Sequence, residues 1–144
     1  MSMTPMIAVH LTAALGALVI GPVALWARRG HSQRIATTTQ RPRLHRAAGY
    51  AWVTLMLLTA LSSLFIHDPA LIGLFGFSPI HLFVPVTLLG LVQAFRQLFR
   101  GNVAGHRKTM LGLYLGACVG AGVFTLLPQR TLGQLVWGQW LGLL

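Results

Sequence analysis

Long apolar stretches alternate with short polar segments along the whole chain. Four stretches come near the roughly 20 residues with which a helix crosses about 30 Å of hydrocarbon. They cover about residues 5–27, 47–66, 79–99 and 109–127. The remaining segment, 131–144, is too short to span, and its Trp137 and Trp140 suit a membrane interface. The pattern therefore predicts an all-α integral membrane protein, one domain over residues 1–144, with a four-transmembrane-helix bundle and a short C-terminal interfacial helix.

Small residues recur at four-residue spacing within two of these predicted helices, and such rows let neighbouring helix backbones approach closely. The rows are Ala13, Ala17 and Gly21 in the first helix, and Gly112, Gly116 and Gly120 in the fourth. We expect both to pack tightly inside the bundle. Thr4-Pro5 and Ser78-Pro79 each put a capping hydroxyl before a proline, so we expect the first and third helices to begin there. We also expect Pro22 and Pro85 to kink helices whose freed carbonyls find other partners.

Composition supports a membrane location, and the placement of charge predicts an orientation. The chain is 55% hydrophobic and 8% charged, with a net charge of +10, and its mean hydropathy is +0.70. All but one of the basic residues lie in or beside the first and third links between the predicted helices. Since cytoplasmic loops carry an excess of Lys and Arg, both links are expected in the cytoplasm and both termini outside. Contact with anionic lipid headgroups follows from this charge, whereas no motif indicates a nucleic-acid partner.

A short motif occurs twice. His10 stands nineteen residues before Arg29-Gly30, and His81 stands nineteen residues before Arg100-Gly101. After a linker, each half continues with a histidine–arginine pair, at His45 and at His106. The economical explanation is duplication of a two-helix unit, which is common in membrane folds, and a chance repeat is the alternative.

Duplication would arrange four histidines as two pairs. Helices one and three run parallel, as do helices two and four, so His10 matches His81 in depth near one face, and His45 matches His106 near the other. Ionisable groups in membrane segments usually face the bundle interior and mark function. Two facing neutral imidazoles are a ligand set for haem iron in electron transfer. Small or polar residues follow His10 and His45 at helical spacing, and we expect them to leave room for a flat ligand. Interhelical hydrogen bonds or interface anchoring are the alternative roles for these side chains.

Other chemistry is largely excluded by what the sequence lacks. Asp68 is the one acidic residue, so no carboxylate pair exists for hydrolysis or for an intramembrane proton relay. There is no phosphate-binding glycine loop and no nucleophile–histidine–acid set. If the chain is an enzyme, it is an oxidoreductase whose bound cofactor supplies the chemistry.

The segments "RG…HRAAGY" and "RG…HRKTM" resemble an uncharacterised bacterial family of four-helix membrane proteins, known as a domain of unknown function, over nearly the whole chain. This resemblance implies a bacterial inner-membrane protein. More distantly, four histidines on alternating helices are similar to the two-haem transmembrane cytochrome b superfamily. That similarity implies haem b, one or two per chain, with His10 and His81 on an outer iron and His45 and His106 on an inner one. Arg46 and Arg107 would hold haem propionates by charge-assisted bonds, or lipid phosphates where no haem is present.

Three function classes follow. The first is a transmembrane electron-transfer protein carrying b-type haem, linked to a quinol or small reductant, with a quinone or another redox protein as partner. The second is a cofactor-free accessory or structural subunit of a larger membrane complex or homo-oligomer. The third is a small-solute transporter, for which the missing carboxylates disfavour proton coupling.

Overall fold

The computed structural model describes residues 5–32, 43–66, 79–128, 131–140 and 142. The long helices are α1 (Pro5–Ser32), α2 (Arg43–Ser63), α3 (Phe83–Phe99) and α4 (Val103–Leu113). The π-helical segment η3 (Tyr114–Gly120) and the short α5 (Ala121–Thr125) continue α4. The remaining elements are the 3-10 turn η2 (Pro79–Leu82), α6 (Thr131–Gln134) and the π-helical η4 (Leu135–Trp140). These described segments contain no strand, which confirms the all-α prediction.

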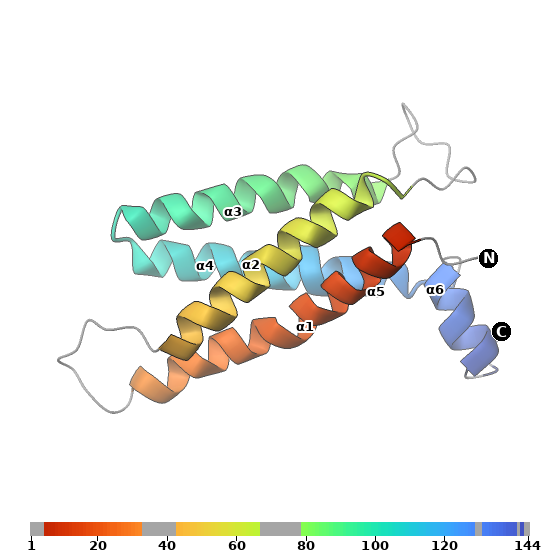
Figure 1. Cartoon of the computed structure of the whole chain (residues 1–144), viewed down its shortest axis with the longest axis horizontal. Helices are drawn as coiled ribbons and strands as arrows, with labels where there is room; N and C mark the ends of the chain where they lie inside the picture. Colours follow the sequence, from red (N-terminus) through yellow and green to blue (C-terminus); the bar gives the residue numbers. More distant parts are fainter. Residues whose placement is uncertain (1–4, 33–42, 67–78, 129–130, 141, 143–144) are drawn as a thin grey trace.

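The long helices form two antiparallel hairpins (Figure 1). In the first hairpin α1 packs along α2, and in the second α3 packs along α4. The hairpins meet where α2 contacts α3 and where α1 contacts η3. Among the described residues, two segments, Pro5–Ala27 and Val103–Thr125, are long and apolar enough to cross a membrane, while Phe83–Phe99 is apolar but shorter. Two hairpins in succession agree with the proposed duplication.

The helices extend further into the polar segments than hydropathy predicts. α1 continues to Ser32, whereas the first apolar stretch ends at residue 27. α2 begins at Arg43 instead of 47, and α4 begins at Val103 instead of 109. Apolar composition marks the part of a helix that suits hydrocarbon, and a helix with basic side chains continues into the interface, where those side chains reach water. As predicted, prolines begin α1 and η2, where no backbone N–H is needed. The capping residues Thr4 and Ser78 lie outside the described residues.

Pro22 in α1 has the compensation that proline requires inside a membrane helix. Its missing N–H leaves the carbonyl of Leu18, four residues earlier, without the usual helix donor. The hydroxyl of Tyr114 donates to this carbonyl at 3.2 Å. The freed carbonyl is thus paired by the other hairpin, as the sequence predicted.

Pro85 differs from its prediction, because it lies in the first turn of α3, where a helix leaves its N–H groups unpaired in any case.

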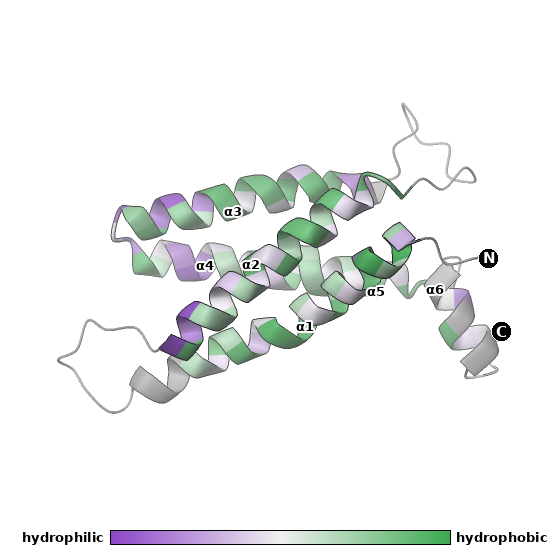
Figure 2. Ribbon diagram, viewed as in Figure 1, coloured by the Kyte–Doolittle hydropathy of each residue, from purple (hydrophilic) through white to green (hydrophobic). Residues whose placement is uncertain are grey.

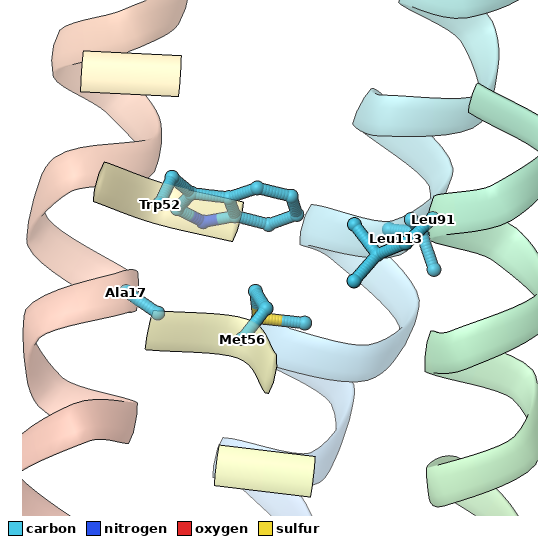
Figure 3. Packing of buried hydrophobic residues seen from close by; sticks show 5 residues of the cluster. All are labelled: Ala17, Trp52, Met56, Leu91 and Leu113. Carbon is cyan, nitrogen blue, oxygen red and sulfur yellow. The ribbon is translucent and has the colours of Figure 1, made fainter. Parts of the chain in front are cut away.

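The core lies at mid-height and draws on every long helix. Its buried members are Ala17, Trp52, Met56, Leu91 and Leu113. Trp52 and Met56 project from α2 toward the other helices (Figure 3). Ala17 is fully buried, and its small side chain leaves room for α2 to approach α1. The predicted packing of the Ala13, Ala17 and Gly21 row is confirmed, since all three are buried.

The second small-residue row behaves differently from its prediction. Gly112 and Gly116 are exposed, and a Cβ atom added at either would meet nothing within 4 Å in the described structure. The reason is that α4 packs on α3 through Leu113, which contacts Gly90, and on α1 through Tyr114. This turns the glycine row away from the described core.

Polar residues collect at one end of the bundle, and the middle is apolar (Figure 2). We call this the basic end, and its described cations lie at the start of α2, the end of α3 and the start of α4. They are Arg43, Arg46, Arg96, Arg100, Arg107 and Lys108. Large apolar side chains such as Leu89, which is 70% exposed, cover the outer surface of the middle. Such a belt suits hydrocarbon surroundings.

Candidate functional site

His45 lies in the first turn of α2, at the basic end. Its Nδ1 is 2.8 Å from the carbonyl oxygen of Ala24 in α1. A carbonyl only accepts, so Nδ1 carries the proton and donates. In the neutral ring the lone pair is then on Nε2. The half-buried imidazole thus joins the two helices of the first hairpin and keeps one nitrogen able to bind a metal.

His106 repeats this arrangement in the second hairpin. Its Nδ1 is 2.9 Å from the carbonyl oxygen of Ala94 in α3, and the same argument assigns the proton to Nδ1. A tight turn places His106 there. Gly101 takes φ +72°, which glycine adopts freely, and Asn102 caps α4 by accepting from the N–H of Gly105 at 2.8 Å.

The two hydrogen bonds are similar in the proposed repeat. In each half, the histidine of the histidine–arginine pair donates to the preceding helix. The acceptor lies five residues before Arg29 in one half, at Ala24, and six before Arg100 in the other, at Ala94. Similar contacts, with acceptors one residue apart in the alignment of the two halves, agree with duplication.

His10 is held at the other end of the first hairpin. Its Nδ1 is 3.0 Å from the carbonyl oxygen of Thr59 and 3.1 Å from the Oγ of Ser62. Ser62 itself donates to the Thr59 carbonyl at 3.1 Å, so its oxygen accepts from the imidazole. Nδ1 therefore carries the proton here too, and Nε2 keeps the lone pair. His81 lies in η2, at the same end of the bundle (Figure 1), and is half-buried.

The histidines form two layers, one at each end of the bundle. Along α1, the steps from His10 to Ala24 give about 21 Å, and those from His45 to Thr59 along α2 give the same. The structure thus places His10 and His81 in one layer and His45 and His106 in the other, as predicted. Hydrogen bonds link His10, His45 and His106 to helix backbones.

Mid-height space between the layers is filled by protein, contrary to the expectation that small residues below each histidine leave room for a flat ligand. Trp52 and Met56 occupy the centre. On α1, the position of a Gly21 Cβ would lie 2.5 Å from the ring of Tyr114. The small residues therefore accommodate large side chains from other helices. A haem held by these histidines would therefore lie at the histidine layers themselves.

Trp52 has an unusual donor within this core. The side chain is 2% exposed, and its Nε1 has no hydrogen-bond partner in the part of the chain that the structure describes. A buried N–H without an acceptor is costly. It lies beside Gly21, where an added Cβ would be 3.1 Å away.

The arginines next to His45 and His106 are exposed. Neither Arg46 nor Arg107 has an ion pair with a described residue, and the only carboxylate side chain, that of Asp68, lies outside the described residues. Both are therefore able to bind an anion from outside the bundle. Within the described segments, no three His, Cys, Asp or Glu side chains gather as a metal-ion site. A haem iron needs only two axial ligands from protein.

Comparisons with known proteins identify a family. The family model described as "Predicted membrane protein (DUF2306)" matches residues 7–136. The match confirms the resemblance to an uncharacterised membrane-protein family. No curated protein and no solved structure matches the chain. The similarity to the two-haem cytochrome b superfamily gains no support from these comparisons and stays a hypothesis.

Proposed function

We propose that this chain, which belongs to the family described as "Predicted membrane protein (DUF2306)", is a transmembrane electron-transfer protein that holds b-type haem by paired histidines. The observation that carries the proposal is that the Nδ1 atoms of His10, His45 and His106 are each held by a hydrogen bond, which leaves Nε2 as the free nitrogen. Each has Nδ1 hydrogen-bonded to a backbone carbonyl of a neighbouring helix. Metal-binding histidines usually have such a partner, which orients the ring and makes the ligating nitrogen more basic.

The residues proposed to hold haem form one set at each end. His10 and His81 would be the axial ligands of one iron, and His45 and His106 those of the other. Arg46 and Arg107 lie at the second site as partners for propionates. Two imidazoles fill both axial positions of a haem iron, which then exchanges single electrons and has no open site for dioxygen.

The protein's own contribution would be position and exclusion of water. The carbonyls of Thr59, Ala24 and Ala94 hold the imidazoles, and the apolar core separates the two layers. A layer spacing of about 21 Å would let one bundle connect the two membrane faces. A quinol or another small reductant at one face and a redox partner at the other fit this role.

We also propose that α2 and α3 cross the bilayer with α1 and α4, and that the basic end is cytoplasmic in the bacterial inner membrane. The antiparallel packing of α2 against α1, and of α3 against α4, supports this topology, and so does the excess of cations at one end.

Cysteine labelling tests the orientation. In a Cys118→Ser background, the Arg100→Cys variant should react with a membrane-impermeant maleimide only after the cells are broken. A cysteine at Gln134 should react in intact cells, and the reverse pattern would refute the orientation.

An absorption spectrum of the detergent-purified protein, before and after dithionite, tests the function. We expect a Soret band, sharp reduced α bands and, by pyridine haemochrome, about two haems per chain, one for each histidine pair. One haem would restrict the proposal to a single pair. A folded but haem-free protein, expressed with haem supplied, would favour the accessory-subunit function, with the histidine hydrogen bonds serving only to hold each hairpin closed.

A further inference from the structure

A groove of 420 Å³ follows the surface where α3 and α4 run side by side (Figure 1). It extends along α4 from Lys108 to Ala117, and Phe83 and Val86 of α3 form part of its other wall. Nine helical steps separate its ends on α4, or about 14 Å. One end is therefore cationic, and the rest is apolar.

Exposed glycines form the floor of this groove. Gly112 of α4 and Gly116 of η3 both line the groove, and a Cβ on either would meet nothing within 4 Å in the described structure. Glycine is a poorer helix former than alanine, and packing of the described chain gives no reason for it at these positions. Because glycine has no side chain, these positions leave space along the groove that an apolar chain could occupy.

The cationic end of the groove lacks a counter-charge. Lys108 is exposed and forms no ion pair with any residue that the structure describes. Arg107 precedes it, and the whole sequence has a single acidic residue, Asp68. An occupant that complements the groove thus carries an anionic group at one end and an apolar chain at the other.

A second copy of the chain fits these charges poorly. Two copies in one membrane have the same orientation, so a twofold contact along the glycine floor would bring the Lys108 side chains of both copies toward each other, and a copy offers no carboxylate side chain except its Asp68. A phospholipid phosphate supplies the missing negative charge, and its acyl chain matches the apolar floor. We propose that the α3–α4 groove binds one anionic phospholipid, with its phosphate at Lys108 and an acyl chain over Gly112 and Gly116.

Lipid selectivity tests this proposal in the full-length protein. The protein would be placed in phosphatidylcholine nanodiscs containing a minor fraction of spin-labelled phosphatidylglycerol, and the motionally restricted lipid would be measured. We expect Lys108→Gln to lower the preference for phosphatidylglycerol about fivefold, and Lys108→Arg to retain it. Arg43→Gln is the matched control, because it removes an exposed cation of the basic end that neither lines the groove nor belongs to the proposed haem sites.

Filling the groove gives an independent arm. Gly116→Leu should reduce the restricted phosphatidylglycerol while leaving all basic residues in place, and Gly112→Leu serves if the first variant does not fold. Equal losses in Arg43→Gln and Lys108→Gln would overturn the proposal in favour of general attraction to the basic end. Unchanged lipid binding in a folded leucine variant would also overturn it. If the native protein is a dimer and the leucine variant is a monomer, the groove binds a second copy of the chain, which would overturn the proposal as well. None of these readouts requires haem, so the result is separate from the proposed function.

Discussion

Alanine in place of His10 is expected to remove about half of the haem and leave the other haem spectrally unchanged. His81→Ala should give the same residual spectrum, because both residues are proposed to hold one iron and a bis-imidazole site loses its low-spin character when either ligand is lost. His45→Ala and His106→Ala should remove the other half. The measurement is the haem content per chain, with the reduced absorption spectrum of each purified variant.

Two control variants distinguish the loss of a haem ligand from the loss of a hydrogen bond that orients it. Ser62→Ala removes one hydrogen-bond partner of His10 but leaves the Thr59 carbonyl, so haem should be retained. His67→Ala removes a histidine that is not among the proposed ligands and should also retain it. The assignment is wrong if every single variant keeps the native spectrum. If the protein has no haem, His45→Ala should instead lower thermal stability by loosening the α1–α2 hairpin, by about 1 kcal/mol.

The sequence predicted those features that depend on one helix at a time. Apolar length predicted the helices, and proline at positions 5 and 79 predicted where two helical segments begin. The repeat spacing predicted which histidines share a depth. These succeed because hydropathy, proline geometry and helical rise are properties of consecutive residues.

Features that depend on how the helices are rotated relative to each other were harder to predict from the sequence. Gly112 and Gly116 were predicted to pack, but the contacts of Leu113 and Tyr114 turn them outward. The partner of the Leu18 carbonyl was likewise unknown. Pro22 indicated that some donor was needed, and Tyr114 was a polar residue in an apolar helix, but only the three-dimensional packing joins them. The carbonyls that hold the histidines are main-chain atoms, which no sequence motif identifies.

Gly21→Ala is expected to destabilise the protein by about 3 kcal/mol. The new methyl group would lie 2.5 Å from Cε2 of Tyr114 and 3.1 Å from Nε1 of Trp52. Both are atoms of rigid rings, and the Tyr114 ring cannot withdraw without breaking the bond from its hydroxyl to the Leu18 carbonyl. Pro22 leaves that carbonyl without a helix donor, so loss of the Tyr114 hydrogen bond would leave it unpaired. This penalty adds to the cost of overpacking.

Glycines elsewhere in the bundle provide a graded comparison. Gly90→Ala should cost less than Gly21→Ala, since its nearest contact is a terminal methyl of Leu113, which can change rotamer. Gly112→Ala should be neutral or stabilising by up to about 1 kcal/mol, because the added methyl meets nothing and alanine favours helix. Thermal or SDS denaturation of the three variants in one detergent measures the order. A Gly21→Ala protein as stable as Gly112→Ala would mean that Tyr114 does not join α4 to α1. The Leu18 carbonyl would then need another donor.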